Sequence, residues 1–302
     1  MREILKPLLP VLLFCGLGGA AFADQGPYPA TQEELEAEYD KLVWERTPGS
    51  HALEKSHSTA TLGQGRSLLL GTNAERALFL MNGVEFPATE AILFDNETGV
   101  FVSYEFFEEG FVRDEDWKDI DAAQLLADLK AGTEEGNRER KAKGIEPLTI
   151  KGWLVEPSYD ATTHTVRWAV ELAEGDGVTV NSFALKLGRL GYEQFTWVGD
   201  REDYDRIGKL LAVATDGQAF DEGHRYGDFA EGDKVAAYGL GALVAAAAGA
   251  KLGKGLIAAL IAFGLILLKK AGVFIALAFG GLLAGFRKLF RRKPKADETP
   301  QE

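Results

Sequence analysis

The 302-residue chain contains a single cysteine, Cys15, and only two methionines. Cys15 lies within the first 23 residues, which have the pattern of a signal peptide that is removed on export. The mature chain is then without cysteine. Disulfide bonds, a thiolate nucleophile and a cysteine-ligated metal are therefore excluded.

Sequence motifs of common enzymes are also missing. The Gly-x-Ser-x-Gly nucleophile elbow is absent, and Ser67, Ser103 and Ser182 have no histidine near them in the sequence, although catalytic triads assemble in space. Residues 249–254 resemble a phosphate-binding loop, but they have three rather than four residues between the glycines and no Ser or Thr after the lysine. We therefore predict no cofactor and assign no catalytic residue, and an enzyme is the less favoured interpretation.

Candidate metal ligands are few. His51 and His57 are six residues apart, which excludes an i,i+4 helical pair, and a zinc finger would also need cysteines. The carboxylates of residues 114–121 lack the glycine and the distal glutamate of an EF-hand loop. No metal site is predicted, and the acidic residues are interpreted as a solvated loop that leads to a helix cap.

The amino terminus predicts export. A basic start with Arg2 and Lys6 precedes an apolar run from Leu8 to about Leu17, and Ala21-Phe22-Ala23 has the small-x-small pattern cut before Asp24. A lipoprotein signal would place a small residue before the modified cysteine, whereas Phe14 precedes Cys15. Residues 1–23 are therefore predicted to be a signal peptide.

A long apolar stretch, Val235–Phe286, predicts a membrane anchor within residues 234–290. Its three apolar blocks hold 16, 14 and 16 residues, each shorter than the roughly 20 residues that span a bilayer without help, so one to three crossings stay open. The basic cluster 287–295 favours a cytoplasmic tail (291–302) under the positive-inside rule, although a two-helix hairpin would leave it outside. Small-xxx-small spacings at 249–253 and 281–285 allow self-association through close helix packing.

Charge is divided along the chain. Residues 24–250 carry 21 Lys and Arg against 42 Asp and Glu, a net charge of −21, whereas residues 251–302 carry 10 basic and 3 acidic residues, a net charge of +7. An acidic outer domain argues against nucleic acid as a partner. The expected location is the bacterial inner membrane, with an extracytoplasmic (periplasmic) domain at 24–233 and the lipid bilayer and an envelope protein as partners.

The pattern of residues 24–233 predicts an α+β fold. A capping box at Thr31–Glu34 opens a helix to about Trp44, and β-rich pieces follow at 59–62, 66–70, 77–81, 91–94 and 100–107. Asp121 is predicted to cap a second helix, and two subdomains, 24–110 and 111–233, are an open alternative to one domain.

The clearest strands come next. Val166, Trp168, Val170 and Leu172 alternate with polar or small residues, as in a half-buried strand. The segments 149–155, 163–172, 178–187 and 192–198 predict an antiparallel meander. Asp200 is predicted to cap a helix that covers the sheet, and C-terminal transmembrane helices complete the architecture.

An ordered series of short motifs resembles an uncharacterised family of bacterial membrane-anchored proteins, known as a domain of unknown function. The series comprises residues 110–116, 137–140, 152–153, 159–160, 164, 168, 187–191, 223–229 and 232–239. The resemblance implies a signal peptide, an extracytoplasmic domain and a C-terminal anchor. It supplies no catalytic residues.

A polar and aromatic set is the candidate binding site, because aromatic rings beside convergent charges form ligand clefts and protein interfaces. Its members are Trp153, Tyr159, Asp160, Arg189, His224, Tyr226 and Asp228. The favoured function is a non-enzymatic module that binds a protein or senses an envelope condition. The alternative is a membrane-tethered hydrolase with Asp/His chemistry at His224 and Asp228 or in the Asp114/Asp116 loop.

Overall fold

Seven antiparallel strands form the large sheet of this computed structural model, which describes residues 25–247 apart from 143, 145 and 176. Their order across the sheet is β3-β4-β5-β9-β8-β7-β6. The strands are β3 (Arg66–Leu70), β4 (Thr89–Asp95), β5 (Phe101–Phe107), β6 (Leu148–Asp160), β7 (Thr165–Glu174), β8 (Gly177–Leu187) and β9 (Tyr192–Asp200). Because β5 pairs with β9, strands from both halves of the domain share one sheet.

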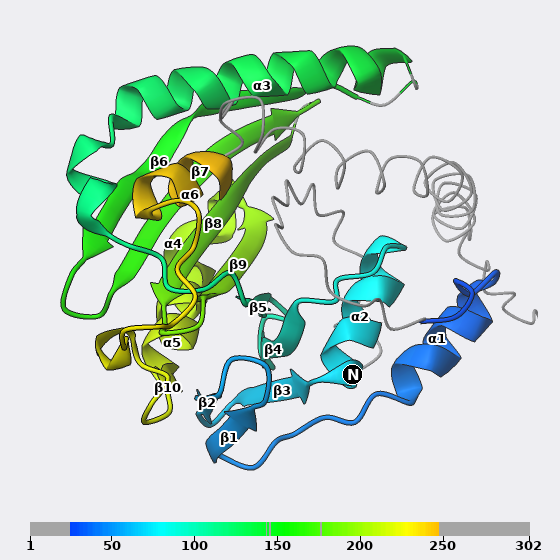
Figure 1. The fold of residues 1–302 in the computed structure, drawn as a ribbon. Helices are drawn as coiled ribbons and strands as arrows, with labels where there is room; N and C mark the ends of the chain where they lie inside the picture. Colours follow the sequence, from blue (N-terminus) through cyan, green and yellow to red (C-terminus); the bar gives the residue numbers. More distant parts are fainter. Residues whose placement is uncertain (1–24, 143, 145, 176, 248–302) are drawn as a thin grey trace, which may run out of the picture.

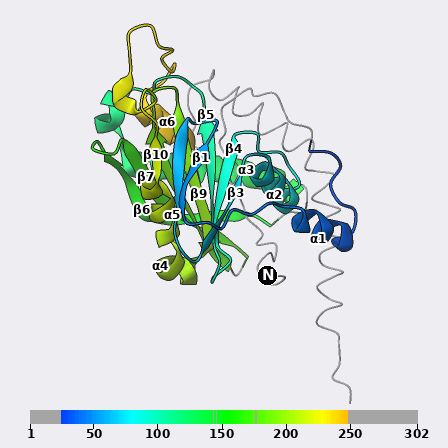
Figure 2. The ribbon, with the colours of Figure 1, turned by 90° about the horizontal axis from the view of Figure 1, so that it is seen from below.

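A small sheet covers one face of the large one. It has the order β1-β2-β10 and consists of β1 (Gly49–Leu53), β2 (Ser58–Leu62) and β10 (Gln218–Phe220). Together with α5 (Lys209–Gly217) it lies over the central strands (Figure 2). The layer between them is the main core, where Tyr104, Phe195 and Trp197 are at most 1% exposed.

Helices cover the opposite face (Figure 1). The helix α2 (Thr72–Asn82) packs on β3 and β4, whereas α3 (Ala122–Ala142) runs along β6. The remaining helices are α1 (Gln32–Asp40), α4 (Tyr204–Ile207) and α6 (Leu240–Ala247), with short 3-10 turns η1 (Glu115–Asp119), η2 (Arg201–Asp203) and η3 (Tyr226–Asp228). The α+β class with covering helices is confirmed.

The predicted meander is confirmed as β6 to β9, which pair in sequence order. Trp168 is 2% exposed, as its place in the alternating strand predicts. The caps at Thr31 and Asp121 are also confirmed. Glu34 N donates to Thr31 Oγ1, and the backbone N–H groups of residues 123 and 124 donate to Asp121 Oδ1.

Three local predictions are wrong or incomplete. Residues 77–81 lie in α2 rather than in a strand, since a short apolar run is compatible with either structure, and the left-handed Gly83 ends the helix. Asp200 ends β9 without capping a helix, and the following helical segment is broken into η2, α4 and α5. The strand β1 was not predicted, because Gly49-Ser50-His51 lacks apolar alternation.

The first apolar block enters the folded domain. The helix α6 buries Leu240, Leu243 and Val244 against the core beside β7 and β8, each at most 2% exposed. Among the described residues no helix is long and apolar enough to cross a membrane. Residues 240–247 are thus part of the domain core, while the predicted signal peptide and the predicted transmembrane helices beyond residue 247 lie outside the described residues.

Candidate binding site

Three segments that are distant in sequence meet at one end of the large sheet. They are the loop after β5 (108–114), the β6–β7 turn (161–164) and the segment 221–239 that leads to α6. Phe111 N donates to Lys234 O, and Arg189 N donates to His224 O. Leu240 N donates to Arg113 O, so the start of α6 is attached to the same loop.

A tyrosine joins an aspartate and a histidine at the centre of this region. Tyr159 OH donates to Asp114 Oδ2 at 2.5 Å and lies 3.0 Å from His164 Nδ1. Because the hydroxyl has one hydrogen, which Asp114 accepts, Nδ1 is the donor to the tyrosine oxygen. Burial, followed by the hydrogen bond to Asp114, raises the pKa of Tyr159. The hydroxyl therefore stays protonated at neutral pH.

The carboxylate and the imidazole are also close to each other. Asp114 Oδ2 lies 3.8 Å from His164 Nδ1, and their side chains are 25% and 32% exposed. A partly open Asp–Tyr–His arrangement can accept a hydrogen bond and pair with a positive charge on a binding partner.

Aromatic rings extend this arrangement into what we call the aromatic cluster, which consists of Phe111, Trp117, Tyr159, Tyr226 and Phe229. The rings of Tyr226 and Phe229 lie 4.5 Å and 4.1 Å from that of Phe111, and Trp117 lies 5.7 Å from Tyr159. Four of the five are half-buried, and Phe111 is 8% exposed. Half-buried aromatic groups with polar ends are typical of protein interfaces.

The Tyr226 ring also contacts His164, at 4.1 Å between centroids. Its hydroxyl donates to Val112 O at 3.1 Å, and burial, with the nearby Asp114 charge, raises the pKa of Tyr226. Tyr226 therefore connects the β6–β7 turn to the loop after β5.

An ion pair holds the neighbouring segment. Arg189 donates Nε and Nη2 to the two oxygens of Asp233, both at 2.8 Å, and Nη1 to Gly223 O. The hydrogen bond from Arg189 is the largest cause that lowers the pKa of Asp233 to about 2. Asp228 Oδ2 accepts the backbone N–H groups of Gly223 and Arg225. Arg189 and Asp228 thus shape this segment.

The ring of His224 stacks on that of His57, with centroids 4.2 Å apart. His224 Nδ1 is buried without a hydrogen-bond partner among the described residues. Asp228 Oδ2 accepts backbone N–H groups, and no hydrogen bond joins His224 Nδ1 to this carboxylate.

Two predicted site residues have structural roles. Trp153 Nε1 donates to Ala122 O at 2.9 Å and packs between the sheet and α3. Asp160 Oδ1 accepts Thr162 N in the β6–β7 turn, and this hydrogen bond is the main cause that lowers the pKa of Asp160.

The five other predicted residues lie around the segment 223–233. Sequence reasoning did not select Asp114 and His164 for this site, because Asp114 and Tyr159 are 45 positions apart in the chain and the sequence gives no signal of their contact.

Within the part of the chain that the structure describes, no group of three or more His, Asp or Glu side chains is placed to hold a metal ion. Asp116 Oδ1 accepts Gly241 N at 3.0 Å, so this member of the acidic loop fixes the start of α6.

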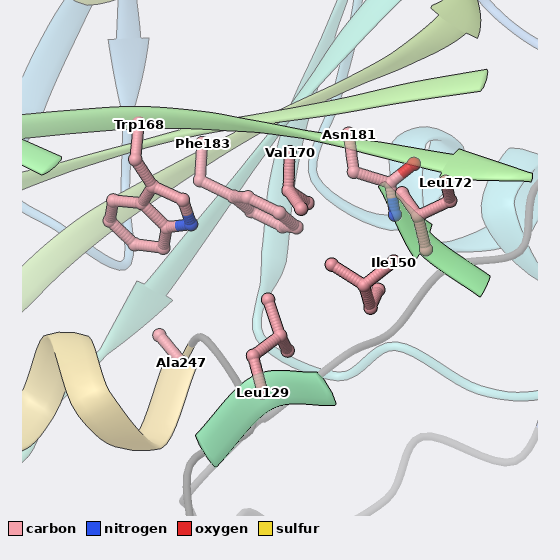
Figure 3. Close-up of a pocket in the computed structure, with 8 residues that line it drawn as sticks. All are labelled: Leu129, Ile150, Trp168, Val170, Leu172, Asn181, Phe183 and Ala247. Carbon is pink, nitrogen blue, oxygen red and sulfur yellow. The ribbon is translucent and has the colours of Figure 1, made fainter. Parts of the chain in front are cut away.

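A small hollow lies on the helix-covered face of the sheet (Figure 3). Leu129 of α3 and Ala247 of α6 face side chains of β6, β7 and β8 across it, and Asn181 is its one polar lining residue. Its volume of about 20 Å³ has room for about one water molecule. None of the described residues that line this hollow is ionisable.

Comparison with known proteins identifies the family. The solution structure of cyanobacterial PsbP (CyanoP) from Synechocystis sp. PCC 6803 matches with 11% identity and a TM-score of 0.35, over 57% of this chain and 92% of that chain. Among curated proteins nothing matches. The model of the family "Protein of unknown function (DUF2167)" matches residues 45–280. The chain therefore belongs to this family of proteins of unknown function.

Proposed function

We propose that this protein is a membrane-anchored extracytoplasmic module that binds a protein partner through the aromatic cluster and is not an enzyme. The observation that carries the proposal is the half-buried ring array around Asp114 and His164. Large aromatic side chains contribute most of the binding energy in many interfaces, and a partly exposed carboxylate supplies specificity.

The position of the cluster fits a membrane-proximal interface. The loop that carries Asp114 also holds the start of α6 through Arg113 O, and α6 has eight residues and ends at Ala247. A helix of this length spans only about 12 Å. If the apolar sequence beyond Ala247 enters the bilayer, the cluster lies near the membrane surface, where a membrane or envelope protein can reach it.

Membrane anchoring is supported by the sequence pattern of residues 248–286 and the basic residues that follow. Alkaline phosphatase fused after residue 233 tests export, and extraction of membranes with alkaline carbonate tests integration. We expect an active fusion and a carbonate-resistant protein. An inactive fusion or a fully extracted protein would contradict this part of the proposal.

Site-specific photo-cross-linking in the full-length protein tests the interface. A photoreactive amino acid at Phe229 is expected to give a reproducible cross-linked partner. The matched control is Glu97, an exposed residue at the opposite end of β5 and roughly 20 Å away. Equal cross-linking from both positions, or none from Phe229, would reject the proposal.

A second candidate is a membrane-tethered hydrolase, favoured by the 3.8 Å approach of Asp114 and His164. His164 would act as the general base, oriented by Tyr159. The change His164→Asn separates the two candidates. It abolishes turnover of any substrate in the hydrolase, whereas in the binding module it weakens partner capture.

A further inference from the structure

Two glutamates face each other in the core between the small and the large sheet. Glu193 of β9 is 0% exposed and Glu90 of β4 is 2% exposed. Glu90 Oε2 accepts the backbone N–H groups of Lys55 and Ser56. Neither oxygen of the Glu193 carboxyl has a hydrogen-bond partner among the described residues, and the Glu90 carboxyl and the Ser56 hydroxyl lie close enough to act on its pKa.

The lysines near this pair are used elsewhere. Lys55 Nζ donates to Glu75 Oε1 and to the carbonyls of Pro87 and Thr89. Lys186, the cross-strand neighbour of Glu193, donates Nζ to the carbonyls of residues 215 and 218. An unpaired buried carboxylate is costly, so burial favours the protonated form of Glu193. Burial, and then the charge of Glu90, raises the pKa of Glu193.

A second buried group without a partner faces the same layer. Gln218 of β10 is 1% exposed, and neither its side-chain nitrogen nor its oxygen has a hydrogen-bond partner among the described residues. It lies opposite Ala60 of β2, a member of the core between the two sheets. The contact between the sheets therefore contains unpaired polar groups, and contact with water would lower their free energy.

We propose that Glu90 and Glu193 share one proton, and that loss of this proton loosens the contact between the small sheet and the large sheet. When base removes the proton to solvent, two carboxylates are left facing each other in the core. Like charges repel, and water must then enter to solvate them. The domain is thereby a pH-responsive unit, independent of the partner binding proposed above.

The other charged groups around the pair set the direction of this response. The positive charges of Lys55 and Lys186 favour the ionised form of the two glutamates, but both lysines donate their hydrogen bonds to the acceptors named above. The charge of Glu105 also raises the pKa of Glu193, and Glu193 in turn raises the pKa of the Tyr104 hydroxyl. Arg167 and Asp216 lie near Lys186. Because Glu105 also titrates, the test must locate the response in the small sheet.

Hydrogen exchange measured by mass spectrometry on the full-length protein in detergent micelles makes this test. After correction for the intrinsic effect of pH, exchange of the β2 and β10 amides is expected to rise at least about 10-fold between pH 6 and pH 9. The E193Q variant is expected to lose this rise in amide exchange. The control variant E202Q, a change at an exposed residue after β9, is expected to retain the rise.

If E193Q does not fold, E90Q serves as the second variant, because it also removes the repulsion between two carboxylates. Infrared difference spectra supply an independent readout, since the carbonyl band of protonated Glu193 is lost in E193Q while that of protonated Glu105 stays. A wild-type protein with equal protection of β2 and β10 at both pH values overturns the proposal. An unchanged rise in E193Q, or in E90Q where that variant replaces it, also overturns it.

Discussion

At the scale of single residues, buried carboxyl groups are the most unusual feature of this domain. Glu105 is 2% exposed on the helix-covered face of the sheet. Its two oxygens accept hydrogen bonds from Ser103 Oγ and Gln194 Nε2, both at 3.3 Å. Burial raises the pKa of Glu105 to about 8.

This shift predicts that acid stabilises the fold relative to base. Between about pH 4.5 and 8 the native state holds a proton on Glu105 that the unfolded chain releases. The stabilising contribution of this proton is therefore fully present below about pH 4.5 and is lost as the pH rises to about 8. The change Glu105→Gln removes this loss, which amounts to at most roughly 5 kcal/mol. Urea unfolding at pH 5 and 8.5 checks it. A variant with the same pH slope as the wild type would contradict the assignment.

The hydroxyl of Tyr159 gives a second prediction. Tyr159→Phe removes the hydrogen bond to Asp114 and is expected to lower the free energy of unfolding by about 1 to 2 kcal/mol. It should also change the NMR chemical shifts of the His164 ring, because it removes the contact between Nδ1 and the hydroxyl. Tyr204→Phe, on the other face of the sheet, is the control. An equal loss of stability in both variants, with unchanged His164 chemical shifts in Tyr159→Phe, would show that the contact has no special role.

At the scale of elements, a turn of the large sheet requires glycine because two backbone segments approach closely there. Gly191, between β8 and β9, faces the carbonyl oxygen of Phe107 so closely that an added Cβ would overlap it. Gly110 N also donates to Leu190 O, so this turn is tied to the end of β5. The turn therefore helps to position the loop that carries Asp114.

Gly191→Ala is accordingly expected to destabilise the domain by at least about 3 kcal/mol, because backbone must move. Gly227→Ala is the matched control, since a Cβ there meets nothing within 4 Å. Thermal unfolding of both variants measures the difference. Similar melting temperatures would refute the steric argument.

At the scale of the whole molecule, the domain ends later than the charge pattern suggests. The helix α6 buries three apolar side chains that a boundary at residue 233 would remove. Those side chains cover Val112 and Leu125, which would then be exposed to water.

Truncation tests this boundary. A fragment of residues 24–247 is expected to unfold cooperatively. A fragment of residues 24–233 loses three buried side chains and is expected to be less stable by roughly 4 to 8 kcal/mol, or unfolded. Circular dichroism during heating compares the two. Equal stability would place α6 outside the core.

Much of the large sheet was predictable because its strands follow short-range rules. The alternation around Trp168 and the turn glycines identify β7 to β9, and the capping patterns at Thr31 and Asp121 identify two helix starts. The prediction at 77–81 is wrong because a short apolar run fits a helix and a strand equally well. Only packing on β3 and β4 selects the helix.

The candidate site was predictable in part. Tyr159, Tyr226, Arg189, His224 and Asp228 gather around one segment, although the roles of the individual residues could not be foreseen. Asp114 and His164 entered the site only through tertiary contacts.

The sequence by itself determined that residues 24–250 contain no cysteine and carry a net charge of −21, and it predicted the α+β class and the meander, because composition and local periodicity control these properties. Tertiary structure decided the pairing of β5 with β9, the Asp114–Tyr159–His164 arrangement and the buried pair of Glu90 and Glu193. These features join residues far apart in the chain. Their energies depend on burial and distance, which exist only in the folded state.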